Sequence, residues 1–205
     1  GRGNRMFMKD LTKKNASVVL IAEDANRDNQ YSFVENIGNK VYFYTNENAP
    51  KGRIMVADAN KPERKNWKDF IPESESVLSG CKGIGDKFIL TYDQDESNHD
   101  YVFGLDGKRM HEITLPSLGS VRFSGNKEDK ECFFSFTSFT NPGAIYTYDV
   151  DNNKYTLYRA PEIKFNPDDL VTEQIFYNSK DGTRIPMFLT YKKDLVKDGN
   201  NPVYL

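Results

Sequence analysis

The chain has 205 residues and a mass of 23.6 kDa, and its 28 Lys and Arg against 30 Asp and Glu leave a formal net charge of −2. No basic stripe could neutralise a row of phosphates, so nucleic acid is not an expected partner. The longest aliphatic run, Val18 to Ala22, is far shorter than the roughly 20 residues of a membrane helix, and we see no signal peptide. We therefore expect a soluble protein that does not contact a membrane, and the sequence leaves its compartment, cytoplasm or periplasm, open.

Residues 1 to 23 read as two strands, Met6 to Asp10 and Val18 to Ala22, of an incomplete repeat unit. Three complete units of about 45 residues follow, and each closes on a strand that ends in proline. These prolines, Pro72, Pro116 and Pro161, lie 44 and 45 residues apart. Four strands in about 45 residues are typical of a β-propeller blade, and the 13% content of aromatic residues favours strands.

Each complete unit has four predicted strands, with an acidic turn after the third. The second strands are almost continuously apolar, which predicts burial on both faces, whereas the fourth strands alternate as half-solvated outer strands do. The predicted strands are, in order within each unit, Tyr31–Asn36, Lys40–Tyr44, Arg53–Ala57 and Trp67–Phe70; Ser76–Cys81, Lys87–Tyr92, Asp100–Phe103 and His111–Leu115; and Gly119–Phe123, Glu131–Phe136, Ala144–Tyr148 and the run that ends at Pro161.

These units make about three and a half four-stranded antiparallel blades, whereas closed propellers usually have four to eight. An arc that does not close leaves strand edges unpaired, so we expect further blades upstream and a longer natural chain. The predicted fold class is all-β, a partial propeller.

The repeat ends after Pro161, and a turn-rich link, Phe165 to Asp169, leads into a different pattern. The apolar runs Ile175–Tyr177 and Ile185–Leu189 flank Lys180-Asp181-Gly182-Thr183, and Asp-Gly between such runs predicts a β-hairpin. Pro186 has no backbone donor and suits the margin of a sheet. A further strand is expected to start at Pro202, so a second domain begins here.

Several motifs resemble known sites, and each has a plainer interpretation. Gly80 to Gly85 lacks the residues of either phosphate-binding loop, and Asp149 to Asn153 lacks the Gly and Glu of a calcium loop and predicts a hairpin turn. Asn15-Ala16-Ser17 matches a glycosylation sequon, which matters only in a secreted eukaryotic protein. The prediction is no metal site and no cofactor.

Cysteine, histidine and channel-facing basic residues complete the candidates. Cys81 and Cys132 lie in apolar strands without zinc spacing and are expected to be reduced core thiols. His99, in the loop from Asp95, and His111, on an outer strand, have no serine or cysteine at a defined spacing. There is no Gly-x-Ser-x-Gly, and hence no nucleophile elbow. Lys82 and Arg122, on or beside first strands, either tune what passes a central channel or are ordinary solvated charges.

Four segments together resemble the prolyl oligopeptidase family of serine peptidases, and the resemblance continues more weakly to Asn4. They are Gly119–Val121, Phe136–Gly143, Gln174–Thr183 and Ile185–Met187. The resemblance implies a seven-bladed propeller that caps an α/β-hydrolase domain, with residues 1–163 as the second half of the propeller and residues 164–205 as the first strands of the hydrolase domain.

The resemblance implies hydrolysis of short peptides on the C-terminal side of proline, with the propeller as gate and size filter. The family's catalytic Ser, Asp and His lie downstream of the matched segments, so no residue of this chain is assigned as catalytic, and the chain alone is expected to be inactive. A stand-alone propeller that binds a protein or glycan is the alternative from another class. A related dipeptidyl peptidase or oligopeptidase B is the alternative within the superfamily. The physiological peptide, the oligomeric state and the route by which substrate passes the propeller stay open.

Overall fold

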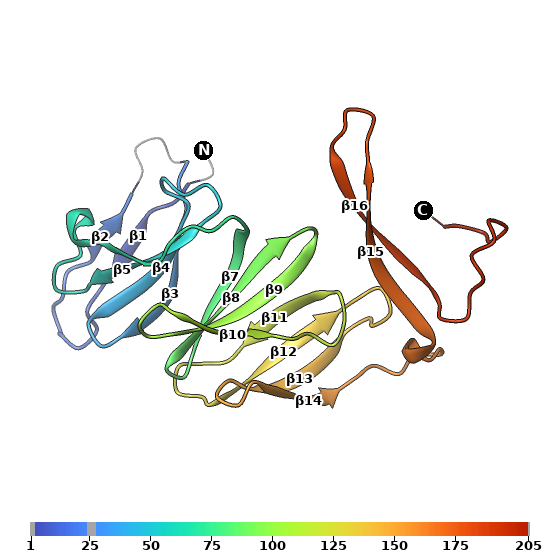
Figure 1. The fold of residues 1–205 in the computed structure, drawn as a ribbon. Coiled ribbons are helices and arrows are strands. Elements are labelled where there is room, and N and C mark those ends of the chain that lie inside the picture. The colour runs from blue at the N-terminus through green and yellow to red at the C-terminus, as the bar shows by residue number, and fades with distance from the viewer. Residues whose placement is uncertain (1–2, 24–27, 205) are drawn as a thin grey trace.

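The computed structural model describes residues 3–23 and 28–204, and within these ranges the chain is almost entirely β-structure (Figure 1). Every paired strand runs antiparallel to its neighbour, and the pairs belong to five separate sheets. Two single-turn 3-10 helices, Arg64–Asn66 and Pro167–Asp169, are the helices of the described ranges. No helix of the described residues is long and apolar enough to cross a membrane.

Three of the sheets are four-stranded meanders, in which each strand pairs with the next in sequence. We call them the first, second and third blades. The first contains β3 Tyr31–Ile37, β4 Lys40–Thr45, β5 Arg53–Asp58 and β6 Lys68–Ile71; the second contains β7 Val77–Ile84, β8 Lys87–Gln94, β9 Ser97–Gly104 and β10 Arg109–Ile113; the third contains β11 Ser120–Ser124, β12 Glu131–Thr137, β13 Ala144–Asp149 and β14 Lys154–Arg159. The predicted repeat, its strands and their order are confirmed.

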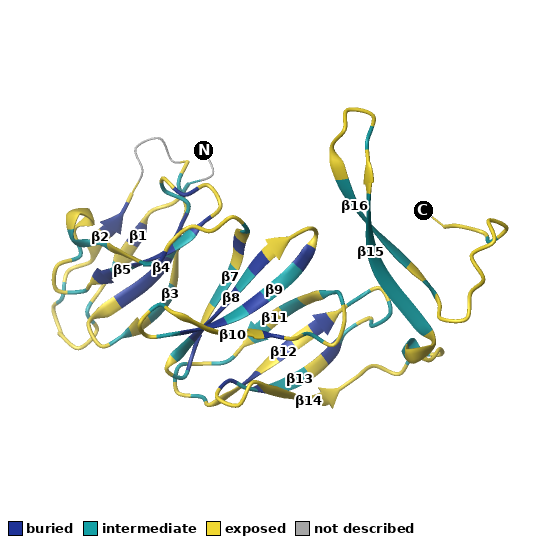
Figure 2. Ribbon diagram, viewed as in Figure 1, coloured by how far each residue is buried: buried dark blue, intermediate teal, exposed yellow. Residues whose placement is uncertain are grey.

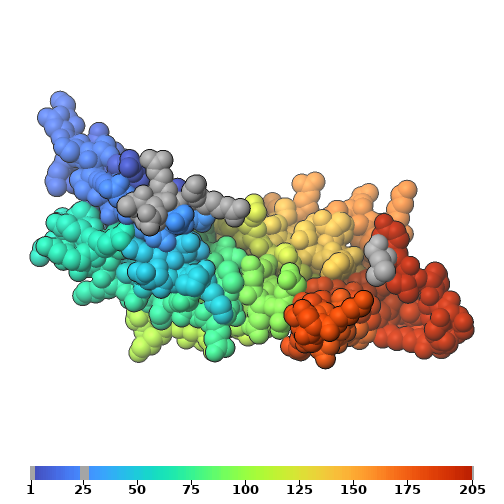
Figure 3. Space-filling view, turned by 90° about the horizontal axis from the view of Figure 1, so that it is seen from above, coloured from blue at the N-terminus to red at the C-terminus, as the bar shows by residue number. Residues whose placement is uncertain are grey.

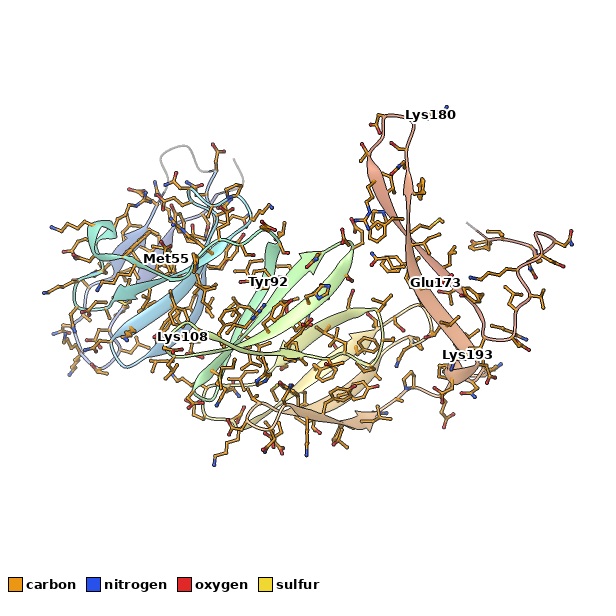
Figure 4. All side chains as sticks on the ribbon, in the orientation of Figure 1. Met55, Tyr92, Lys108, Glu173, Lys180 and Lys193 are labelled. Atoms are coloured by element: carbon orange, nitrogen blue, oxygen red, sulfur yellow. The ribbon has the colours of Figure 1, made fainter. Side chains whose placement is uncertain are left out.

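A two-stranded sheet precedes the blades and another follows them. β1 Met6–Met8 pairs with β2 Val19–Ala22 as the predicted half-blade. β15 Leu170–Asn178 pairs with β16 Arg184–Lys192 without interruption of the register, which confirms the predicted hairpin. Figure 4 shows Lys180 at the free end of this hairpin, and Pro186 lies opposite Phe176 in a sheet that has no third strand among the described residues.

The blades stack face to face, and the core lies between them. Phe43 and Met55 of the first blade pack on Met6 and Ile21 of the half-blade. The other two interfaces are also apolar: Tyr42 and Ile54 meet Leu78 and Phe88, and Ile89 and Val102 meet Phe134 and Tyr148. Burying one such side chain contributes about 1.5–3 kcal/mol to the free energy of folding, so these interfaces hold each blade against the next. In the view of Figure 3, the half-blade, the three blades and the hairpin follow one another along the molecule in chain order.

The third blade departs from the prediction that second strands are buried on both faces. That prediction holds for β4 and β8, but β12 alternates strictly, with Phe134 buried and Phe133 45% exposed (Figure 2). The physical reason is that one face of β12 packs on the second blade, while no sheet among the described residues covers the other. Phe133 and Tyr158 meet edge to face on this open side.

Candidate functional site

The two histidines lie within strands of the second blade. His111 is on outer strand β10 as predicted, but His99 is on β9 and not in a loop, because the turn before it is only two residues long, Asp95 and Glu96. His99 Nδ1 lies 3.3 Å from Glu112 Oε1, and His111 Nε2 lies 3.2 Å from the Tyr148 hydroxyl. No hydrogen bond in the described ranges joins either ring to a serine or cysteine, so neither belongs to a nucleophilic pair.

Both cysteines are free thiols inside the blades. Burial raises the pKa of the Cys81 thiol far above its usual range and raises the pKa of Cys132 to about 12. A thiol with a raised pKa stays protonated at neutral pH and is a poor nucleophile. The interpretation as structural thiols is therefore consistent with their surroundings.

The two loop-like motifs have the plainer structures. Gly80 to Ile84 lies in strand β7, where no helix follows that could hold a phosphate. Asp149 is the last residue of β13, and its carboxylate accepts bonds from the backbone N–H groups of Asp151 and Asn152, which makes a tight turn into β14. Among the described residues there is no group of three or more His, Cys, Asp or Glu that could hold a metal ion.

The basic candidates lie on first strands, Lys82 on β7 and Arg122 on β11, and both are exposed. Each first strand is an edge of its sheet, and neighbouring blades approach closely there, since a Cβ on Gly83 would lie 2.9 Å from Glu35 Cγ. This convergence is expected around a propeller axis. That the two cations face a channel stays a prediction.

The second blade also contains a buried carboxyl group that the sequence pattern did not single out. Asp100 on β9 is fully buried; Thr91 Oγ1 donates to its Oδ1 at 2.5 Å, and its Oδ2 has no partner among the described residues. Burial raises the pKa of Asp100 to about 6, against the opposing effect of the Thr91 hydroxyl. The apolar pattern of the strand gives no sign that this carboxyl group is buried.

The strongest candidate for a functional surface is the junction between the blades and the hairpin, formed by Asp95, Phe139, Gln174 and Phe188. The rings of Phe139, between β12 and β13, and Phe188, on β16, lie 5.4 Å apart. Gln174 Nε2 donates to the Asp95 carbonyl, which the β8–β9 turn presents with Asp95 at φ 48° and Glu96 at φ 62°. In Figure 4 the hairpin stands beside the blades, with Glu173 midway along β15.

A cavity of about 290 Å³ lies at this junction. Phe139 and Phe188 supply aromatic walls, and hydroxyl groups of Ser97, Ser120 and Thr137 supply polar ones. An apolar pocket with a few polar groups is the usual form of a small-ligand or peptide subsite. The junction thus has the composition of such a subsite.

Residues 1–161 match the family model described as prolyl oligopeptidase, N-terminal beta-propeller domain. The chain belongs to the prolyl oligopeptidase family. This family membership agrees with the resemblance in the sequence and with the face-to-face stacking of consecutive four-stranded sheets. It places β3 to β14 in the family's propeller domain.

Curated members of the family match the chain well beyond the propeller. Prolyl endopeptidase of Elizabethkingia meningoseptica is 35% identical over 204 residues, which are 99% of this chain and 28% of that protein. Prolyl endopeptidase of Dictyostelium discoideum is 32% identical over 214 residues, 98% of this chain and 28% of that protein. The chain thus spans about 28% of the length of these prolyl oligopeptidase relatives.

Solved prolyl oligopeptidase structures have the same arrangement. One, from a study of two prolyl endopeptidases and the role of inter-domain dynamics in their catalysis and specificity, has a TM-score of 0.81 at 32% identity and covers 98% of this chain and 29% of its own. Prolyl oligopeptidase B from Galerina marginata, as the apo protein, has a TM-score of 0.85 at 25% identity and covers 95% of this chain and 28% of its own.

Proposed function

We propose that this chain is the propeller part of a serine-type prolyl endopeptidase that hydrolyses short peptides on the C-terminal side of proline. The observation that carries the proposal is the continuous match to prolyl endopeptidases, at 35% identity over 99% of the chain, which runs through the blades and into the hairpin. A protein that shared only a generic propeller would have no reason to share the hairpin as well.

In this proposal residues 1–163 form the second half of a seven-bladed propeller, and residues 164–205 begin an α/β-hydrolase domain. No triad residue lies in the chain, so the catalytic groups come from other parts of the protein. The hairpin fits the start of another domain because its apolar residues Ile175, Met187 and Leu189 are only half-buried, as expected of a sheet that awaits further layers.

The blades would contribute exclusion rather than bond-breaking chemistry. A channel along the first strands admits an extended peptide and rejects a folded protein. Water excluded from the closed site no longer weakens the electrostatic stabilisation of the transition state. The partners are then short proline-containing peptides and the remaining blades and hydrolase domain of the same protein.

The proposal is tested with protein made from the complete open reading frame. We expect it to release a chromogenic group attached after Gly-Pro, and a serine-directed inhibitor should abolish this release. Protein that is folded by circular dichroism yet releases nothing would refute the peptidase function and leave the propeller as a binding module.

A further inference from the structure

The three complete blades are joined by a contact that the meander topology does not require. The β11–β12 loop of the third blade, residues 125–130, extends across the inner end of the second blade and reaches the first. Lys127 Nζ donates to the Asn36 carbonyl at 3.2 Å and to Asn36 Oδ1 at 3.3 Å, and it lies 3.6 Å from Glu35 Oε1. The two partners are 91 residues apart in sequence and belong to blades that are not neighbours.

The loop is held by hydrogen bonds of its own in addition to this contact. Asp129 Oδ2 accepts from the Asn126 backbone N–H at 2.9 Å, and the Asp129 N–H donates to the Asn126 carbonyl at 3.1 Å. These bonds close a turn that presents Lys127 at its apex. A preformed turn loses less conformational entropy when its lysine binds than a free loop would.

The second blade is held beneath the loop. Gly85 N–H donates to the Asn126 carbonyl at 3.2 Å. A Cβ on Gly85 would lie 2.9 Å from the Asp129 carbonyl oxygen, and Gly85 has φ +58°, so both space and backbone conformation favour glycine there. Gly83, beneath Glu35, allows the other close approach. The glycine-rich segment that resembled a phosphate loop thus serves as the surface over which two neighbouring blades meet.

We propose that Lys127, Glu35, Gly83 and Gly85 together join the three blades into one rigid unit, and we call this group of residues the clasp. The clasp lies at the end of the sheets that is remote from the hairpin. This end is opposite the junction, because β8 runs from Lys87 beneath the loop to the Asp95 turn that binds Gln174. A cavity of about 600 Å³ lies under the clasp. If neighbouring blades of the whole protein separate at this end of the sheets, the separation must then occur outside β3–β14.

If the clasp joins the blades, a substitution of Lys127 in the third blade should raise hydrogen exchange in the first blade as well. Lys127→Met removes both hydrogen bonds to Asn36 and the ion pair with Glu35, which are the contacts that join the third blade to the first. We expect hydrogen exchange of the full chain to rise at least about tenfold both in residues 126–130 and in the β3–β4 turn, residues 36–39. This structural readout does not depend on peptidase activity.

Two further variants make the test decisive. Lys130→Met is the matched control, because Lys130 lies on the same loop, is exposed and makes no ion pair in the described part of the chain, and it should leave exchange at residues 36–39 unchanged. Glu35→Gln should raise exchange in the β11–β12 loop from the opposite side. The effect of the double variant should be smaller than the sum of the two single effects, because both changes break the same contact. Three results would overturn the clasp: exchange in Lys127→Met that rises only within residues 126–130, an equal rise at residues 36–39 in Lys130→Met, or a double variant whose effect equals the sum of the two single effects.

Discussion

Replacement of Asp100 by asparagine should stabilise the protein above pH 6 and remove a pH dependence that the parent shows. Its carboxyl group has no exposed surface and only one hydrogen-bonded oxygen, so ionisation costs the folded state more than the unfolded one. Burial raises its pKa from 3.8 to about 6.

The sign and size follow from proton linkage. Between pH 4 and pH 6 the folded state binds more protons at Asp100 than the unfolded state does, so the free energy of unfolding falls as pH rises through this window. Each pKa unit corresponds to about 1.4 kcal/mol, and the shift therefore costs the parent up to about 3 kcal/mol above pH 6. Asp100→Asn keeps an acceptor for Thr91 and cannot ionise.

Urea unfolding, followed by the fluorescence of Trp67, the one tryptophan, measures this difference at pH 4.5, 6 and 8. Subtracting parent from variant at each pH cancels the titration of every other group. We expect the difference to grow with pH and to level off above pH 6, while exposed Glu128→Gln shows no such trend. A flat difference for Asp100→Asn would refute the reasoning.

Three other predictions concern the junction, the half-blade and the thiols. Phe139→Ala should speed proteolysis of the link around residues 162–169 because it removes the ring that meets Phe188, whereas Phe133→Ala should not; equal rates would contradict the role of the junction. Arg64→Ala should lower the free energy of unfolding by about 1–3 kcal/mol, because Arg64 binds Glu47, the Tyr31 hydroxyl and the Glu23 carbonyl. Urea unfolding measures this loss, and a loss smaller than the error of the method would contradict the prediction. Cys81 and Cys132 should resist a thiol reagent at pH 8 until urea unfolds the chain, because burial raises both pKa values; rapid native labelling would show that they are accessible.

Much of the fold follows from local pattern, and what does not follow comes from contacts between blades. The period of about 45 residues placed the strands of all three blades, and Lys180-Asp181-Gly182-Thr183 placed the hairpin, because turn chemistry and strand alternation are local. Alternation cannot say which blade has a covered outer face, so β12 was predicted as buried on both sides. The position of His99 depended on a two-residue turn with positive φ at Asp95 and Glu96, neither of which is glycine.

The sequence patterns did not predict the contacts that form the functional surfaces. Phe139 lies in a segment that carried the family resemblance and Phe188 directly follows another, yet nothing in their spacing indicates that the two rings touch. Lys127 is one of many lysines in the sequence, and only the stacking of three blades brings it to Asn36. Long-range packing of this kind has no periodic signal.

The central claim, that the chain belongs to an enzyme that cuts peptides after proline, is tested most directly by mass spectrometry of the products that the complete protein makes. The substrate is a peptide of about ten residues with one internal proline, compared with the same peptide carrying alanine at that position. We predict a single cut on the C-terminal side of proline and none in the alanine peptide. Cleavage of both peptides at the same bond, or of neither, would contradict the account.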